Sequence, residues 1–509
     1  MSKEKPDAKA LRVAKELKNA HNWKHLARMH EGGYYELRTE DTGDVPVRLF
    51  LTPTLLGDAE DILYRQIINA TRFPGVRLVV ITPDTHYGYG VPVGCVLITD
   101  AREGAIAMGP VGYDIGCGMM SARSDVEAEA ATPERRLAFN RAVMERVDMG
   151  AGGKSLRLGK LSESEFLNLV RGGAEYYVEQ YGATFDRSRA ERHRIPVDDD
   201  WRIPWGGKGR PERGRDQLGS LGGGNHFIEL QRSEQTGTLF LQVHTGSRGF
   251  GHGLATNYFE LARDEHPGLM KDIDLGYFTP ESRHYRDYQN AVAAGGNYAI
   301  LNRLVIFEGV AEAFREVFGS ELELVYEISH NLVQREQHPE FGDVWVHRKG
   351  ATRAFPAGHP SLVGTRWAET GHPVLIPGSN KDWSYILRPL AGAERSGYSV
   401  NHGAGRRMSR GEATRTLSQR QMDDEYRAAG IVVNANGRVP LDEAAPAYKS
   451  SAEVIAAVVG AGLAEVEHQL WPLASLKGVD GRKAKRGKGD KGGKPRDRKR
   501  EGKHTSEHY

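Results

Sequence analysis

The sequence predicts a mixed fold of the α+β class, and three observations lead to this prediction. Stretches with apolar residues at helical spacing are interspersed with short apolar runs that have the pattern of strands. Hydrophobic residues make up 39% and charged residues 27% of the 509 residues, which is ordinary for a globular protein with a large core. Several histidines follow the strand-like runs directly, at positions that a rigid sheet would fix for chemistry.

The elements follow from local patterns along the chain. Strands are expected over 77–82, 95–99, 239–243, 322–328 and 344–347, and helices over 132–147, 161–180, 284–318 and 449–470. The helix at 132 has Thr132 in the N-cap position and Pro133 at the first helical position. Residues 187–214 are rich in Arg, Gly and Pro and have little periodicity, so we expect a surface excursion or a lid over the site.

The last 31 residues have a different composition from the rest of the chain. The net charge of the whole chain is only +2, yet residues 479–509 hold 12 Lys and Arg against 5 Asp and Glu. This segment has almost no apolar side chain to bury, so it predicts a disordered basic tail. Such a tail either increases solubility or attracts the phosphates of RNA or DNA.

Membrane and secreted classes are disfavoured. No apolar run reaches the roughly 18–20 residues that a membrane helix needs. The first 25 residues are polar and lack the apolar region of a signal peptide. The only cysteines, Cys95 and Cys117, exclude a disulfide framework, so we expect a cytoplasmic protein.

Five short glycine-rich segments each carry a histidine or a cysteine: 111–119, 221–227, 243–249, 329–331 and 401–406. Histidine, cysteine and aspartate hold transition metals, and glycine lets the backbone approach a phosphate closely. These segments are far apart in the chain and must converge if they form one site. The pattern therefore favours a metal-assisted enzyme over a binding module.

One aspartate, one cysteine and three histidines could hold two divalent ions around a bridging thiolate. They are Asp114, Cys117, His226, His244 and His330. Two ions at short range suit phosphoryl or nucleotidyl transfer, and the donor types favour zinc, iron or manganese over magnesium. The alternative is a buried free cysteine in a glycine turn and hydrogen-bonded structural histidines.

His402 differs from the other histidines because arginines follow it, at 406, 407 and 410. A neutral imidazole is a competent nucleophile at phosphorus, and arginines would hold the phosphates that it attacks. The segment 347–356 offers a second arginine–glycine cradle for an anion, and Ser379 and Ser384 offer hydroxyls on a Pro-Gly turn. The alternative for His402 is a sixth metal ligand or a structural turn residue.

Eight segments in order resemble the RtcB family of RNA-splicing ligases. They are PDTHYGYGVPVG, GPVGYDIGCGM, LGGGNHFIE, HTGSRG, SHN, RKGATRAFP, IPGS and HGAGRRMSR, and the match runs over about 49–478. The resemblance implies one mixed α/β catalytic domain with a central active-site cleft. We expect an N-terminal extension over 1–45, the catalytic domain over 46–478 and the tail over 479–509.

The resemblance also implies an activity. It is the GTP-dependent joining of RNA 3′-phosphate or 2′,3′-cyclic phosphate ends to 5′-hydroxyl ends, in tRNA splicing or RNA repair. His402 would form a covalent histidine–GMP, and the guanylate would pass to the RNA end as an RNA-3′-pp-5′-G intermediate. Two Mn²⁺ ions would be bound, and the protein would act as a monomer.

By the same resemblance, Asp114, Cys117 and His226 would hold one Mn²⁺, and Cys117, His244 and His330 the other. The expected nucleotide contacts are Asn225, His226, Phe227, Ile228, Glu229, His330, Asn331, Pro377, Gly378, Ser379, Asn380, Ser384, His402, Gly403, Ala404, Gly405, Tyr448 and Lys477. The expected RNA-phosphate contacts are Arg248, Arg353, Arg406 and Arg410. Asp84 and His86 would have a supporting role.

The chain departs from the family pattern after IPGS, where Asn380 and Lys381 stand in place of methionine and glycine. The choice of nucleotide is therefore open. Two other functions fit the same residues: a two-metal phosphohydrolase or nuclease acting on nucleic-acid ends, and a non-catalytic protein that binds RNA ends. The sequence also leaves open which RNA is joined, whether DNA ends are used and whether an activating protein partner is needed.

Overall fold

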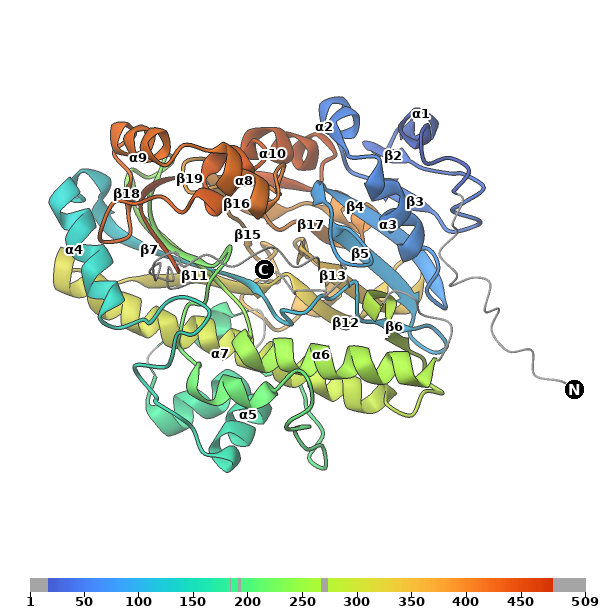
Figure 1. Ribbon diagram of the computed structural model, residues 1–509, viewed down its shortest axis with the longest axis horizontal. Helices are drawn as coiled ribbons and strands as arrows, with labels where there is room; N and C mark the ends of the chain where they lie inside the picture. The colour runs from blue at the N-terminus through green and yellow to red at the C-terminus, as the bar shows by residue number, and fades with distance from the viewer. Residues whose placement is uncertain (1–16, 184, 191–193, 267–272, 479–509) are drawn as a thin grey trace, which may run out of the picture.

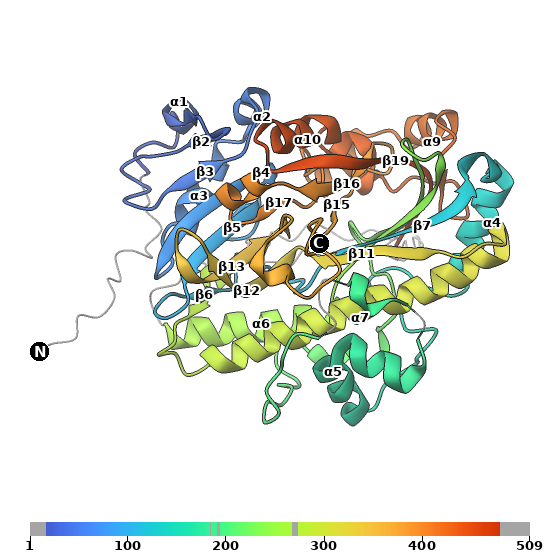
Figure 2. The same ribbon diagram turned by 180° about the vertical axis from the view of Figure 1, so that it is seen from behind.

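The computed structural model describes residues 17–183, 185–190, 194–266 and 273–478. Two large sheets lie next to each other, and helices cover them on both sides (Figures 1 and 2). Helices and strands both make up a substantial part of the chain, so the predicted mixed fold class is confirmed.

The first sheet has seven strands in the order β1-β2-β3-β4-β5-β13-β12. Their bounds are β1 Arg28–His30, β2 Tyr34–Glu36, β3 Val47–Leu49, β4 Val76–His86, β5 Val93–Asp100, β12 Asn331–His338 and β13 Gly342–Lys349. β3 and β4 are parallel, and the other neighbours are antiparallel. The first three strands thus extend a sheet whose centre comes from later parts of the chain.

The second sheet has eight strands, with the path β11-β7-β9-β8-β19-β16-β15 and β18 alongside β19. Their bounds are β7 Gly118–Glu127, β8 Phe227–Ser233, β9 Thr238–Thr245, β11 Glu323–Ser329, β15 Val374–Ile376, β16 Ser384–Pro389, β18 Val432–Val433 and β19 Ala464–Lys477. Strand β19 is the last strand of the described chain, and it lies between β8 and β16 in the interior of the sheet. Two small ribbons complete the strands: β6 Ile106–Ala107 with β10 Tyr277–Phe278, and β14 Ala351–Arg353 with β17 Ser399–Asn401.

The helices divide between the two sides of the sheets (Figure 1). Their bounds are α1 Trp23–Leu26, α2 Pro53–Asp58, α3 Ile62–Ala70, α4 Pro133–Met144, α5 Glu163–Tyr181, α6 Arg248–Glu265, α7 Tyr285–Phe318, α8 Arg410–Thr416, α9 Gln419–Ala428 and α10 Ser451–Gly460. The long helix α7 packs against β7, β9 and β11, with α5 and α6 outside it. The largest hydrophobic core lies between these helices and the eight-stranded sheet.

Most of the elements expected from the sequence are present. The three expected helices before residue 320 correspond to α4, α5 and α7, with a break in α5 at Gly173, and Thr132 caps α4 through Arg135 N at 3.4 Å. Four of the five expected strands lie within β4, β5, β9 and β13, and the fifth, 322–328, corresponds to β11, which begins one residue later. The helix expected over 449–470 is wrong in its second half, because α10 ends at Gly460 and β19 begins at Ala464.

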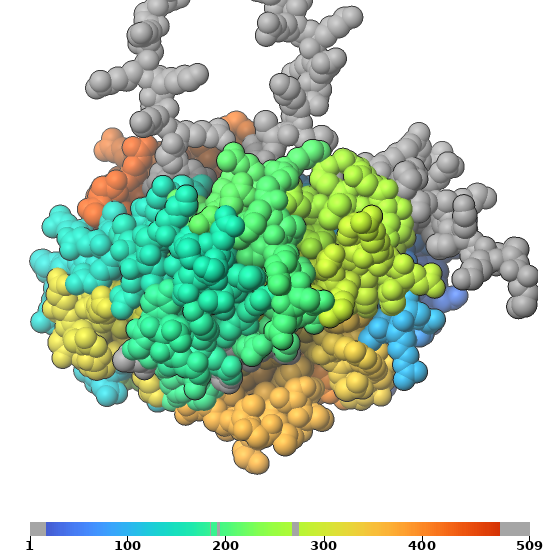
Figure 3. Space-filling model, turned by 90° about the horizontal axis from the view of Figure 1, so that it is seen from below, coloured from blue at the N-terminus to red at the C-terminus, as the bar shows by residue number. Residues whose placement is uncertain are grey.

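The described residues of the segment 187–214, which are 187–190 and 194–214, lie on the outside of the helical layer, on the face that Figure 3 shows in green. The short 3-10 helix at Pro211–Asp216 packs on α6, and Asn257 of α6 accepts a hydrogen bond from Gly209 N at 2.9 Å. Tyr298 of α7 donates to Gly214 O at 2.9 Å. These contacts fix the C-terminal half of the segment as part of the surface. The tail expected over 479–509 lies outside the described residues.

Candidate active site

The predicted ligand segments meet at one end of the eight-stranded sheet because of its register. Gly118, the first residue of β7, is paired with Ser329 of β11 on one side and with Thr245 of β9 on the other. The residues adjoining these three in the chain are Cys117, His330 and His244. Three candidate ligands from distant segments therefore lie side by side at the same edge.

His330 has a special place in the topology. It is the single residue between β11, which belongs to the eight-stranded sheet, and β12, which belongs to the seven-stranded sheet. Its backbone N–H donates to Cys117 O at 2.7 Å, and its carbonyl accepts from Ala351 N at 3.2 Å. The candidate site thus lies where the two sheets join.

The turn that carries Asp114 and Cys117 is held close to α7. Gly116 has a φ of +78°, and a Cβ at this position would come 2.7 Å from Ala299 Cβ and 3.0 Å from Gly296 Cα. A side chain here would meet helix backbone, so only glycine allows this approach. Asn331 holds the other side of the turn, because its Oδ1 accepts from Gly350 N at 2.8 Å and its Nδ2 donates to Asp114 O at 3.3 Å.

Two groups of side chains have the arrangement of metal ligands. Cys117, His244 and His330 form one group, and Asp114, Cys117 and His226 form the other, with the ligand atoms of each group within 4.8 Å of one another. Cys117 Sγ is 3.3 Å from His244 Nε2 and 3.6 Å from His226 Nε2. The Nε2 atoms of His244 and His330 are 3.2 Å apart. One thiol therefore belongs to both groups.

The histidine rings are oriented by the backbone. His226 Nδ1 lies 3.1 Å from Leu221 O, and His244 Nδ1 lies 3.1 Å from Asn225 O. A carbonyl oxygen only accepts, so Nδ1 carries the proton and the Nε2 lone pair faces the cluster. Metal-bound histidines commonly have such a carbonyl partner on the second nitrogen. The donor set and its orientation therefore fit divalent transition-metal ions.

The charges of the cluster suit cations. Burial and then the neighbouring imidazoles lower the pKa of His244 well below its usual range, so the ring is neutral. Burial raises the pKa of Asp114, but its contacts with His226 and the hydrogen bond from Ser247 N, at 3.0 Å, outweigh it and bring the pKa to about 2. Burial, together with Asp114, raises the pKa of the Cys117 thiol. A cation at Sγ would reverse this last shift, because a coordinating thiol is deprotonated.

His402 lies beside this cluster on the segment after β17. Its ring centroid is 4.8 Å from that of His330. Its Nδ1 is 2.6 Å from Asp84 Oδ2, which also accepts from the backbone N–H groups of His402 at 3.0 Å and Gly403 at 3.3 Å. Thr82 donates to the other oxygen, Oδ1, at 2.6 Å. Burial raises the pKa of Asp84, but its contacts with His402 and Thr82 outweigh burial and hold it below the usual range.

A second polar cluster surrounds Glu443, which is 2% exposed. Arg410 Nε lies 3.0 Å and Arg406 Nη1 3.2 Å from Glu443 Oε1, and Lys477 Nζ lies 3.8 Å from Oε2. Tyr448 donates to the same carboxylate. Burial raises the pKa of Glu443, but the three cations outweigh it and bring the pKa to about 2.

The cluster around Glu443 joins the other predicted nucleotide residues through Lys477. The Lys477 ammonium lies 5.2 Å from the centre of the Phe227 ring. Glu229 is 3% exposed, and burial raises its pKa to about 7. Ser384 Oγ accepts from Gly378 N and from Gln231 Nε2, each at 3.0 Å.

The side chain of Asn380, one of the predicted nucleotide residues, is buried and only partly hydrogen-bonded. It is 3% exposed, and its Oδ1 accepts from Tyr426. The Tyr426 hydroxyl accepts from Ala445 N at 2.9 Å, so its one proton goes to Asn380. The Asn380 Nδ2 group is buried and has no hydrogen-bond partner among the described residues. An unpaired buried donor of this kind is rare and requires an explanation.

The remaining predicted contacts differ in how they are placed. Gly403 lies against Pro377, since a Cβ there would be 3.4 Å from Pro377 O, and Ala404 and Gly405 are buried. Ile228 is 1% exposed and belongs to the main hydrophobic core. His86 is close by, with Nδ1 at 3.0 Å from Asp84 O.

The arginines predicted to contact RNA phosphates are engaged within the protein. Arg248 donates to Gly150 O at 3.0 Å, and Arg406 and Arg410 pair with Glu443. Arg353 is 4% exposed, and its guanidinium lies 4.6 Å from the centre of the Phe355 ring. An RNA phosphate would reach Arg353 only if this packing opened.

The sequence reasoning missed Glu443 and Tyr426 and gave Asp84 only a supporting role. Asp84 stands in the segment PDTH, and its distance from residue 402 in the chain hid the pairing. Glu443 lies five residues before Tyr448, a predicted nucleotide residue, and this proximity was the one signal in the sequence that could have identified it.

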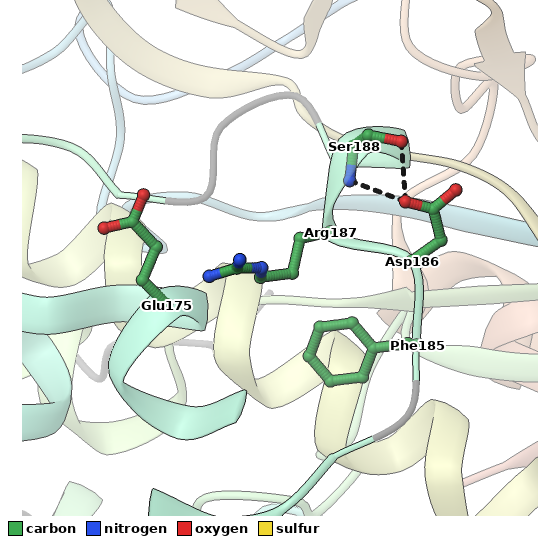
Figure 4. Close-up of a pocket in the computed structure, with 5 residues that line it drawn as sticks. All are labelled: Glu175, Phe185, Asp186, Arg187 and Ser188. Carbon is green, nitrogen blue, oxygen red and sulfur yellow. Dashed lines mark hydrogen bonds between the residues drawn. The ribbon is translucent and has the colours of Figure 1, made fainter. Parts of the chain in front are cut away.

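A surface cavity of about 490 Å³ lies elsewhere, between α5 and the segment that follows it (Figure 4). Its lining residues are Glu175, Phe185, Asp186, Arg187 and Ser188. Asp186 Oδ1 accepts from the Ser188 backbone at 2.9 Å and from its hydroxyl at 2.6 Å. The cavity contains no predicted site residue.

None of the helices in the described ranges has the length and apolar character to cross a bilayer.

Comparison with known proteins gives matches that include the segments described above. The model of a family described as tRNA-splicing ligase RtcB matches residues 66–478. A tRNA-splicing ligase RtcB of Pyrobaculum aerophilum is 37% identical over 466 residues, which cover 85% of this chain and 95% of that protein. The tRNA-splicing ligase RtcB of Thermococcus kodakarensis is 35% identical over 464 residues, with the same coverage of 85% and 95%. The RNA-splicing ligase RtcB of Mycobacterium tuberculosis is 35% identical over 440 residues, which cover 81% of this chain and all of that protein.

Proposed function

Because the chain belongs to the RtcB family of tRNA-splicing ligases, we propose that it is a GTP-dependent ligase that joins RNA 3′-phosphate or 2′,3′-cyclic phosphate ends to 5′-hydroxyl ends. Its role would be tRNA splicing or RNA repair. The observation that carries this proposal is the pairing of His402 with Asp84 beside the metal-ligand cluster.

The pairing prepares His402 as a nucleophile. Asp84 accepts the Nδ1 proton, so the lone pair of Nε2 is free to attack. Attack on the α-phosphate of GTP forms an N–P bond, and pyrophosphate leaves. The negative charge of Asp84 stabilises the imidazolium that results, as a carboxylate does for a catalytic histidine.

The later steps use the same histidine as a leaving group. An oxygen of the RNA 3′-phosphate attacks the histidine-bound phosphorus, the N–P bond breaks, and an RNA-3′-pp-5′-G end forms. The 5′-hydroxyl of the second RNA then attacks the phosphate next to the 3′-oxygen, and GMP leaves. A cyclic phosphate is first opened by hydrolysis.

Asp114, Cys117 and His226 would hold one Mn²⁺, and Cys117, His244 and His330 would hold the second. When bound, such ions would neutralise negative charge on the phosphate oxygens during phosphoryl transfer. The guanylate would lie along the segments at 225–229, 377–380 and 402–405, with Lys477 and Tyr448 at its far end. Residues 46–478 would form the catalytic domain of a cytoplasmic monomer, with the basic tail available to attract RNA.

The test is covalent labelling with α-³²P-GTP and Mn²⁺. The ligase mechanism predicts an acid-labile label on the wild-type protein that is absent in His402→Ala. A phosphohydrolase or nuclease that uses the same metal cluster would release product from RNA ends without any labelled protein. A protein that only binds RNA ends would do neither. ATP and dGTP in parallel reactions determine the nucleotide choice.

A further inference from the structure

Two arginines in the described part of the chain are no more than 1% exposed, although burying a charge is unfavourable. Arg303 of α7 is 0% exposed and Arg348 of β13 is 1% exposed. Each is paired with a carboxylate: Arg303 with Glu327, and Arg348 with Glu336, whose two oxygens lie 2.6 and 3.1 Å from the guanidinium. A buried ion pair is seldom needed for stability, because apolar residues of similar volume often serve as well. Their other contacts indicate what they do.

Three further hydrogen bonds of Arg303 go to residues next to candidate metal ligands. Nη1 donates to Gly116 O at 2.7 Å and to Thr245 O at 2.9 Å, and Nη2 donates to Ser329 Oγ at 2.8 Å. The neighbours of these three residues in the chain are Cys117, His244 and His330. One planar guanidinium therefore ties together the three segments that form one of the two ligand groups.

Asn302, the preceding residue of α7, extends this contact to the fourth segment. Its Oδ1 accepts from Gly219 N at 2.7 Å, and its Nδ2 donates to Ser220 O at 3.2 Å and to Gly246 O at 3.1 Å. Residues 219 and 220 belong to the turn that leads to His226. Two consecutive residues of α7 thus hold all the ligand-bearing segments, through backbone groups and the Ser329 hydroxyl.

Arg348 contacts a different part of the site. Its Nε donates to Ser399 Oγ at 2.9 Å, and Nη2 lies 3.4 Å from Gly397 O. Ser399 begins β17, the strand that leads directly to His402. Arg348 therefore holds β17, the strand before His402, in place, and it makes none of the contacts of Arg303.

We propose that Arg303 and Arg348 are positioning residues with separate duties: Arg303 sets the geometry of the metal ligands, and Arg348 sets the position of His402. The inference rests on the proposed function. The guanidinium fork is required, because a lysine ammonium has all three of its donors on one nitrogen and cannot span acceptors that lie around a planar fork.

The experiment removes each ion pair as a unit, so that no unpaired charge remains in the core. The variants are R303M/E327M and R348M/E336M, with Arg303→Lys and Arg348→Lys as second variants. Phe314→Leu is the matched control, because Phe314 is also 0% exposed on α7 and lies about 16 Å from Arg303 along the helix axis. The readouts are Mn²⁺ affinity by calorimetry, rate of His402 labelling, and hydrogen exchange of metal-free protein at 329–331 and 399–401.

R303M/E327M should weaken Mn²⁺ binding about 10- to 100-fold, as loss of ligand-orienting partners does. R348M/E336M should bind Mn²⁺ as the wild type does, label about 10- to 100-fold more slowly, and exchange faster at 399–401. If either double variant does not fold, the corresponding lysine variant must show the same pattern. Phe314→Leu should leave both Mn²⁺ affinity and labelling rate unchanged.

Equal loss of metal affinity and labelling in both double variants, or wild-type behaviour of both, would overturn the division of duties. Wild-type protein that binds no Mn²⁺ would instead overturn the proposed function, and the inference with it. Wild-type protein that binds Mn²⁺ alongside an R303M/E327M variant that binds equally well overturns the inference alone.

Discussion

His402 Nδ1 lies 2.6 Å from Asp84 Oδ2, and the two residues are 318 positions apart in the chain. The carboxylate also accepts from two backbone N–H groups at the start of the His402 segment, so it fixes both the ring and the backbone that carries it. In the proposed mechanism, a histidine held in this way has one reactive nitrogen and one direction of attack.

Asp84→Asn should slow the labelling of His402 by GTP about 10³- to 10⁴-fold, as loss of the orienting carboxylate does in other catalytic histidines. An amide can donate to Nδ1, which would move the proton to Nε2 and block attack. Thr82→Val is the control, because Thr82 contacts Asp84 Oδ1 and not the histidine. Its labelling should stay within about 10-fold of the wild type, the effect of one hydrogen bond. Labelling of Asp84→Asn at the wild-type rate would refute the role of the carboxylate.

Cys117 belongs to both ligand groups, whereas Asp114 belongs to one. Cys117→Ser should therefore lower the Mn²⁺ content from two ions per chain to less than one, because a serine hydroxyl does not ionise readily. Asp114→Asn should leave one ion bound, in the group of His244 and His330. Metal analysis after dialysis measures both values. Full metal content in Cys117→Ser would rule out a bridging thiolate.

Glu229 should make stability depend on pH. Burial raises its pKa from 4.5 to about 7, so the folded protein holds this proton more tightly than the unfolded chain. The free energy of unfolding therefore falls as the pH rises from about 4.5 to about 7, by up to about 3 kcal/mol. Glu229→Gln should remove this loss and be more stable than the wild type at pH 8, as measured by urea denaturation.

The opposite sign is expected for Glu443→Gln. The pKa of Glu443 is lowered to about 2, so its ionised form stabilises the folded protein above pH 4.5, and this stability is lost as the pH falls toward 2. Its replacement should destabilise the protein at pH 8 and have little effect at acid pH. If both variants change stability in the same direction at pH 8, the assignment of charges in this pocket is wrong.

Asn380 should select the nucleotide. Its oxygen is committed to Tyr426, so the group that remains is the Nδ2 donor, which suits a carbonyl acceptor such as guanine O6. Asn380→Ala should raise the KM for GTP about 5- to 30-fold, in line with about 1–2 kcal/mol for one buried hydrogen bond. If the protein is also labelled by ATP, Asn380→Ala should leave the KM for ATP unchanged, because adenine has an amino group where guanine has O6. An equal effect on both nucleotides would show that Asn380 acts only on the packing of the pocket.

The candidate ligands could be proposed from the sequence because they lie in short glycine-containing segments next to strands, and the structure brings these side chains together. The sequence could not predict the Asp84–His402 pair or the Glu443 cluster, since these contacts join residues that no local pattern connects. The error over 449–470 has a clear physical cause. Ala, Glu and Leu continue a helical composition past Gly460, yet Gly462 has a φ of +64° and ends it. Pairing with β8 and β16 then makes residues 464–477 a strand, so neighbours in the sheet override local propensity.

The interior position of β19 also has a consequence for how the protein is made. The strand that leads from His226 lies next to β19, and β19 is the last described strand to leave the ribosome. The sheet therefore lacks an interior strand until residue 477 has been synthesised, and until then β8 and β16 each have an unpaired edge. A chain that stalls before this point would lack the central strand of the sheet rather than an outer one. Metal binding and enzymatic activity should accordingly appear only after residue 477 has been synthesised.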